Sequence, residues 1–175
     1  ALQSKAALEA LVARVLDARQ QKMAAGAAHI PILIKIAPDL LDADVHDISD
    51  VALNSDIDGL IVSNTTITRP ESLASRHRQE AGGLSGAPLM APSTEMLAAV
   101  YQATGGKVPL VGVGGIASGA DAYAKIKAGA SLVQLYSALV YDGPGLVTKI
   151  KQELTALLKA DGYSCVANAV GKGPR

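Results

Sequence analysis

Residues 108–139, VPLVGVGGIASGADAYAKIKAGASLVQLYSAL, contain a complete strand–helix–strand pattern. An apolar run at 109–114 ends in two glycines, and a second apolar run follows at 131–136. Between them, Ser118 and Asp121 have the spacing of a capping box, which predicts the start of a helix. Because two strands joined through one helix normally lie parallel in a sheet, this stretch predicts a parallel α/β fold.

The rest of the chain continues this alternation of strands and helices. The pattern predicts strands at residues 32–37, 59–64, 109–114 and 131–136, and helices at 4–25, after Asp42 or Asp44, after Ser93, at 118–129 and at 145–161. In the first helix the predicted inner face comprises Leu8, Leu11, Val12, Val15 and Leu16. The strand at 32–37 is predicted to be buried. No linker interrupts the chain, so residues 1–175 are expected to form a single unit.

Composition excludes several functional classes. The formal net charge is zero and no basic stripe is present, which argues against nucleic-acid binding. No apolar run is long enough for a membrane-spanning segment. The single cysteine, Cys165, has no histidine partner at a meaningful spacing, so we assign it no chemistry. We predict no metal site.

The segment Gly112–Ala117, GVGGIA, is close to the fingerprint of a dinucleotide site. That site also needs an acidic residue about 20 positions later to hold the ribose. No Asp or Glu lies between Asp121 and Asp142, so the dinucleotide interpretation is disfavoured. The glycine pair instead suits the phosphate site of a (β/α) barrel, which is formed by the loops after the last two strands.

Two further features support a phosphate site. Gly114 and Gly115 lack Cβ atoms, so their N–H groups can approach an anion closely. Tyr136 and Ser137 form a second polar turn after the next strand. The alternative is a glycine turn that only packs a strand against a helix.

The other strands also end in polar residues, at the edge where parallel sheets bind ligands. Lys35 interrupts an apolar strand, either as a structural ion pair or as a cation beside a group that becomes negative. Asn64 can recognise an amide or imide edge, or can simply end the strand. Thr65 follows it.

The segment at 65–92 shows no clear period, and a loop of that length is usually functional or mobile. Its GGLSG motif contains Ser85 and Gly86, which suit close approach to a ligand, although a flexible linker is the alternative. We interpret the charged residues of this segment as solvated surface charge: Arg69, Arg76, His77 and Arg78.

Four stretches together resemble the second half of the class 2, quinone-linked dihydroorotate dehydrogenases. They are ILIKIAPDL (32–40), DGLIVSNTTITRP (58–70), GGLSGAPL (82–89) and VGVGGIASGADAYAKIKAGASLVQLYSALVYDGP (111–144). The resemblance implies an FMN-binding (β/α)8 TIM barrel, of which this chain supplies about the last four βα units. It also implies oxidation of dihydroorotate to orotate in pyrimidine biosynthesis, with a quinone as electron acceptor.

The resemblance also assigns roles to residues. Lys35 would contact the flavin ring where reduction places negative charge, and Ser63 would also contact the flavin. Asn64 and Thr65 would hydrogen-bond orotate. The FMN phosphate and ribityl contacts would come from Ser85, Gly86, Gly114, Gly115, Tyr136 and Ser137. Part of the quinone tunnel would be lined by Leu139, Val140 and Pro144.

Such a barrel typically needs about 250 residues, so the first four units are expected in an N-terminal half that acts as a partner. The general base is expected there too, so no catalytic residue is assigned in this chain and the isolated chain is predicted to be inactive. The resemblance places the whole protein peripherally on the mitochondrial inner membrane, or alternatively on a bacterial inner membrane. Two other functions stay open: a non-catalytic, self-associating half-barrel that binds phosphate, and a different FMN barrel oxidoreductase.

Overall fold

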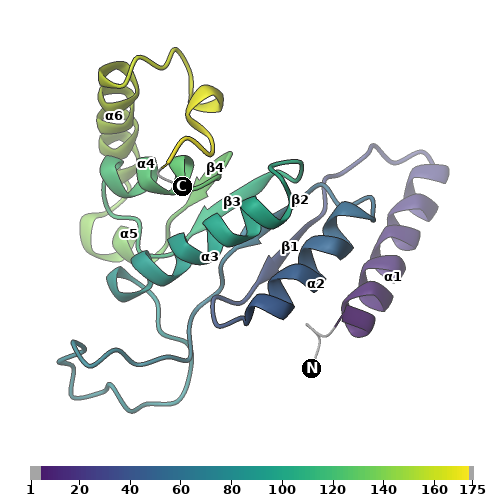
Figure 1. The fold of residues 1–175 in the computed structure, drawn as a ribbon, viewed down its shortest axis with the longest axis horizontal. Helices are drawn as coiled ribbons and strands as arrows, with labels where there is room; N and C mark the ends of the chain where they lie inside the picture. The colour runs from purple at the N-terminus through teal and green to yellow at the C-terminus, as the bar shows by residue number, and fades with distance from the viewer. Residues whose placement is uncertain (1–4, 174–175) are drawn as a thin grey trace.

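The computed structural model describes residues 5–173 and contains one parallel sheet flanked by helices (Figure 1). The strands are β1 (Leu33–Ile36), β2 (Gly59–Val62), β3 (Leu110–Val113) and β4 (Leu132–Gln134). Neighbouring strands are all parallel, and their order in the sheet is their order along the chain. The predicted parallel α/β sheet is therefore confirmed.

The helices alternate with the strands. They are α1 (Lys5–Ala24), α2 (Asp42–Leu53), α3 (Met90–Ala103), α4 (Gly119–Lys127), α5 (Ser137–Asp142) and α6 (Gly145–Ala160), with 3-10 turns η1 (Ala87–Leu89) and η2 (Val166–Ala169). The predicted cap of α4 is confirmed, because the Ser118 hydroxyl accepts a hydrogen bond from the Asp121 amide at 3.1 Å. The cap of α2 differs: Leu41 is the capping residue, and its amide donates to the Asp44 carboxylate at 3.0 Å.

The core lies between the sheet and its helices. Ile36, Leu60, Val62 and Leu110 are buried there, together with apolar side chains of α2 and α3. Alternate residues of the two edge strands are exposed. They are Leu33 and Lys35 of β1 and Leu132 and Gln134 of β4. The prediction that residues 32–37 form a buried strand is therefore wrong for one face of the strand. Within residues 5–173, helices cover one face of the sheet and leave the opposite face exposed.

Helix α1 lies beside α2 at the end of the helical layer (Figure 1). Leu8 and Val12 are buried, but Leu11 and Val15 are each 39% exposed, so the predicted five-residue inner face is too wide. A helix with a single neighbour buries a narrower stripe than one packed between two. Asp58 immediately precedes β2, and it fixes the other end of α1 because its carboxylate pairs with the Arg19 guanidinium at 2.6 Å.

Helix α3 begins at Met90 rather than after Ser93. Pro92 lies in its first turn, where a missing N–H costs no helical hydrogen bond. The segment before α3 leaves the sheet and returns to it, and Thr66 pairs with Leu84 where its two ends meet. Between these ends the chain projects away from the sheet (Figure 1). Within residues 5–173 no helix is both long and apolar enough to cross a membrane.

Candidate functional site

A pocket of about 360 Å³ lies at the carboxyl ends of the strands. Its volume falls within the range of roughly 300–1,000 Å³ that is common for small-molecule sites. All ten residues predicted to bind cofactor or substrate line it: Lys35, Ser63, Asn64, Thr65, Ser85, Gly86, Gly114, Gly115, Tyr136 and Ser137. Residues up to about 100 positions apart in the chain meet here because parallel strands end at one edge of the sheet.

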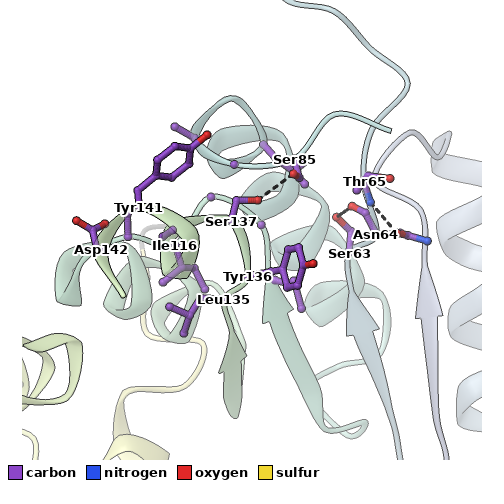
Figure 2. Close-up of a pocket in the computed structure, with 18 of the residues that line it drawn as sticks. Ser63, Asn64, Thr65, Ser85, Ile116, Leu135, Tyr136, Ser137, Tyr141 and Asp142 are labelled. Atoms are coloured by element: carbon purple, nitrogen blue, oxygen red, sulfur yellow. Dashed lines mark hydrogen bonds between the residues drawn. The ribbon is translucent and has the colours of Figure 1, made fainter. Parts of the chain in front are cut away.

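The segment after β2 presents an oriented amide to the pocket. The buried Ser63 hydroxyl donates to the Asn64 carbonyl at 3.0 Å, and the Asn64 side-chain Oδ1 accepts from the Thr65 amide at 2.9 Å (Figure 2). The Asn64 NH2 group donates to no other group within residues 5–173. Asn64 thus keeps two donors for a ligand.

The long segment between β2 and α3 packs closely on Thr65. A Cβ at Gly83 would lie 1.9 Å from Thr65 Oγ1, so only glycine fits there. Below it, the carboxylate of Asp39 accepts hydrogen bonds from the Thr66 hydroxyl, the Ile67 amide and the Thr68 hydroxyl. These contacts hold Thr65 and the residues after it in place without filling the pocket.

Two hydroxyl groups face each other on the opposite side of the pocket. Ser85 Oγ and Ser137 Oγ are 2.9 Å apart (Figure 2); Ser85 comes from the long segment and Ser137 from the start of α5. Gly86 follows with a φ of 79°, a backbone conformation that residues other than glycine rarely adopt. The long segment therefore joins the rim of the sheet and is not a free linker.

The Gly114–Gly115 turn rests directly on the first turn of α3. A Cβ at Gly114 would lie 2.7 Å from Ser93 Oγ, and one at Gly115 would lie 2.5 Å from Met90 Cβ. Both glycines have positive φ, 113° and 74°. The amides of Gly86, Gly114 and Gly115 donate to no acceptor within residues 5–173. Three free N–H donors beside a pocket can bind an anion.

Lys35 is on the uncovered face of β1, in register with Ile61 of β2. No carboxylate pairs with it within residues 5–173, so the ion-pair alternative finds no partner in the part of the chain that is described. The Lys35 ammonium is therefore available to a ligand.

The sequence analysis missed Lys125, which lies just behind the glycine turn. It is 0% exposed, and its ammonium donates to Ser93 Oγ at 2.5 Å and to the Met90 carbonyl at 3.3 Å. Burial lowers the pKa of Lys125 to about 7, and the nearby Asp121 carboxylate opposes part of that effect. A signal was available: Lys125 lies three residues after buried Ala122, on the inner face of α4.

The residues predicted for a quinone tunnel lie outside the pocket. Leu139 is partly buried against the apolar cluster that contains Ile116 and Leu146, while Val140 and Pro144 are exposed. Tyr141 and Asp142, which were not predicted, line the pocket from the end of α5 (Figure 2). Within residues 5–173 no group of three or more His, Cys, Asp or Glu side chains is placed to hold a metal.

Four parallel βα units with a ligand-sized pocket at the strand ends define a piece of a (β/α) barrel whose rim carries the site. The model of the family "Dihydroorotate dehydrogenase" matches residues 1–158. The chain belongs to this family.

Relatives from several organisms agree. The dihydroorotate dehydrogenase (quinone) of Xanthobacter autotrophicus is 57% identical over 98% of this chain and 48% of its own. The mitochondrial dihydroorotate dehydrogenase (quinone) of Oryza sativa is 52% identical over 97% of this chain and 36% of its own. This chain therefore spans about half the length, or less, of these curated relatives.

The crystal structure of the Eimeria tenella dihydroorotate dehydrogenase in complex with ferulenol has the same fold. It superposes with a TM-score of 0.93 at 38% identity, over 98% of this chain and 49% of the Eimeria chain. The predicted architecture, a partial (β/α) barrel, is confirmed by this likeness and by the parallel sheet.

Proposed function

We propose that this chain supplies the FMN-phosphate site and part of the orotate site of a dihydroorotate dehydrogenase that passes electrons to a quinone. The observation that carries the proposal is the set of polar groups around the pocket: three glycine amides without an acceptor among the described residues, a pair of serine hydroxyls hydrogen-bonded to each other, and the side-chain NH2 of Asn64. The family membership gives that donor set a ligand, because the whole protein acts on dihydroorotate by its family name.

The residues present fit a phosphorylated flavin. The amides of Gly86, Gly114 and Gly115 would bind the phosphate, because all three residues line the pocket and their N–H groups have no acceptor within residues 5–173. The hydroxyls of Ser85 and Ser137, with the Tyr136 turn, would extend this contact toward the ribityl chain. The phosphate would then lie at the end of the pocket formed by β3 and β4.

FMN, when bound, would supply the hydride acceptor for dihydroorotate oxidation. Lys35 would hold a positive charge beside the flavin ring, and Ser63 would contact the same ring. Asn64 and Thr65 would orient the flat pyrimidine by hydrogen bonds. No group in this chain is assigned as the general base. We place that base in the other half of the barrel, and the isolated chain is expected not to turn over.

We further propose that the whole protein is peripheral to the membrane that holds its quinone, with Leu139, Val140 and Pro144 near the quinone path. The exposure of Val140 and Pro144 supports this, since a path for an apolar substrate needs apolar groups that the fold leaves uncovered. Bacterial relatives support a bacterial inner membrane, and the plant relatives named mitochondrial support the mitochondrial inner membrane.

The test pairs this chain with the part of the Xanthobacter autotrophicus relative that it does not match, by co-expression. The pair should purify with bound flavin, oxidise dihydroorotate, and show a flavin absorbance change when orotate is added. Asn64→Ala should retain FMN and weaken orotate binding by at least about tenfold, the cost of one lost hydrogen bond to a buried ligand. Asn54→Ala is the matched control, because Asn54 lies at the end of α2 and outside the pocket.

Three results would count against the proposal. A pair that folds but stays colourless would exclude the flavin site. Flavin binding without dihydroorotate oxidation, but with another substrate oxidised, would favour a different FMN barrel enzyme. Turnover by the isolated chain would show that the base does not lie elsewhere.

A second function is favoured by the uncovered face of the sheet, where Leu33 and Leu132 are exposed. Such a face would suit a phosphate-binding half-barrel that pairs with a second copy of itself. Sedimentation with flavin absorbance separates the two functions, because a stable colourless dimer would support this one.

A further inference from the structure

We infer that Lys125 is a positioning residue for the flavin phosphate: its ammonium group holds the first turn of α3 against the Gly114–Gly115 turn and places a positive charge behind it. Lys125 does not line the pocket, so it acts through its neighbours. The inference rests on the proposed function, because it concerns the same phosphate site.

The contacts form a chain from α4 to the pocket. The Lys125 ammonium donates to Ser93 Oγ at 2.5 Å and to the Met90 carbonyl at 3.3 Å. With its oxygen accepting from the ammonium, the Ser93 hydroxyl donates to the Leu89 carbonyl, also at 2.5 Å. The Gly114 carbonyl lies 3.4 Å from the same hydroxyl. One buried cation thus fixes both the end of η1 and the start of α3.

The glycine turn depends on that arrangement. Because a Cβ at Gly114 or Gly115 would overlap Ser93 or Met90, the turn lies in direct contact with the groups that Lys125 holds. A shift of the first turn of α3 would move the support of both free amides. Anion sites made of backbone N–H groups need this kind of fixed placement, because their donors cannot rotate toward the ligand as side chains do.

Few other charged groups lie near the Lys125 ammonium to offset its charge. Asp121, on the same helix, is the one ionisable group whose charge acts on Lys125 among the described residues, and its carboxylate is already occupied by Ser118 and the Ala117 amide. From α3 the lysine meets hydroxyl and carbonyl groups, and from β3 it meets Gly112. A buried ammonium facing neutral groups is screened little by solvent, so it can attract a nearby phosphate.

The decisive experiment compares FMN with riboflavin, which lacks the phosphate, in the co-expressed pair. Lys125→Met should weaken FMN binding by about tenfold or more, about 1.4 kcal/mol, because the positive charge behind the turn is lost and the first turn of α3 is released. Riboflavin affinity should change by less than about twofold, about 0.4 kcal/mol, because riboflavin has no phosphate for the charge or the glycine turn to hold. Lys127→Met is the control: it removes the same charge from the same helix, but Lys127 pairs with Asp161 away from the turn.

The outcomes separate this inference from the proposed function. Equal loss of FMN and riboflavin binding would mean that Lys125 has only a structural role, and this would overturn the inference. Unchanged FMN binding in Lys125→Met would also overturn it and leave the proposed function intact. If the wild-type pair bound neither flavin, the proposed function would fail and the inference with it.

A second measurement serves if Lys125→Met does not fold. The ratio of FMN to riboflavin affinity is measured in the wild-type pair as the pH is raised from about 7. The second pKa of the phosphate is near 6, so at this starting pH the phosphate is already doubly charged. The ratio should fall as Lys125 loses its proton, in a range above its ligand-free pKa of about 7, because a bound phosphate raises that pKa. A flat ratio up to about pH 10, where ordinary lysines lose their protons, would overturn the inference.

Discussion

Asp39 fixes the start of the long segment between β2 and α3, and Arg69 joins its two ends. Asp39 collects three hydrogen bonds from the residues that follow Thr65. The Arg69 guanidinium donates to the carbonyls of Glu80 at 3.0 Å and Gly82 at 2.7 Å. The interpretation of Arg69 as solvated surface charge is therefore wrong, since a planar group with five donors is well suited to join several carbonyls.

Asp39 should make the stability of this region depend on pH in the acidic range. Burial opposes its charged form, but hydrogen bonds from Thr66, Ile67 and Thr68 outweigh burial and hold the pKa of Asp39 below its ordinary value. A carboxyl group whose folded-state pKa is depressed stabilises the fold above its unfolded pKa of about 3.9 and loses that contribution as pH falls through the folded value.

We therefore expect the unfolding midpoint of the wild-type chain to fall with acid in this range, and Asp39→Asn to reduce the dependence. The measurement is thermal unfolding as a function of pH. Asp17→Asn, on exposed α1, serves as the control and should keep the wild-type slope. An Asp39→Asn slope identical to that of the wild type would contradict the expectation.

At the scale of residues, strand-end reasoning could place Lys35, Asn64 and Gly115 at one rim, because parallel strands leave no other edge for them. It could not place Lys125 or Arg69. Their partners are set by how α3 sits on α4 and by how a long segment folds back, and neither is encoded in a local period.

Helices α4 and α6 cross closely at Gly119. A Cβ at Gly119 would lie 2.3 Å from Glu153 Cβ and 2.8 Å from the Leu154 amide nitrogen. The Gly119 amide donates to the Glu153 carboxylate at 2.7 Å. Helix α6 thus supports the first turn of α4, the helix that carries Lys125.

Gly119→Ala should destabilise the fold by about 1–3 kcal/mol, because the added methyl group overpacks this crossing. Gly145→Ala is the matched control: a Cβ there meets nothing within 4 Å, and the residue does not have positive φ. The control should be neutral or slightly stabilising. Urea unfolding midpoints measure both, and equal midpoints would show that α4 and α6 can separate at no cost.

The strands and longer helices could be predicted because each has a clear apolar period or run. Helix α5 could not, since six residues directly after a strand are too few to show a period. The start of α3 was misplaced by four residues because Pro92 looks like a helix boundary in sequence but lies within the first turn.

The whole sheet is open at both sides. Strands β2 and β3 have neighbours on each side, whereas β1 and β4 each have one within residues 5–173. We expect amide hydrogen exchange to be slowest in β2 and β3 and faster in the edge strands.

Co-expression with the unmatched half of the Xanthobacter autotrophicus relative should slow exchange at both edges at once, because a closed barrel has no free strand edge. Hydrogen-exchange mass spectrometry compares the chain alone with the pair. Protection that spreads to one edge only would indicate a different mode of association.

The alternation of strands and helices could be predicted for the whole molecule, but the uncovered face could not. Apolar runs such as ILI and LVGV indicate burial without indicating what covers them. That information lies outside a chain that spans about half of its curated relatives.

The strand order matches the chain order, and this bears on how the molecule is made. Each newly synthesised βα unit finds its pairing partner in the unit released just before it, so no strand has to wait for a distant segment or thread between two others. A ribosome would therefore release this chain as a growing sheet that lengthens at one side, with β4 docking after the other three strands that the structure describes.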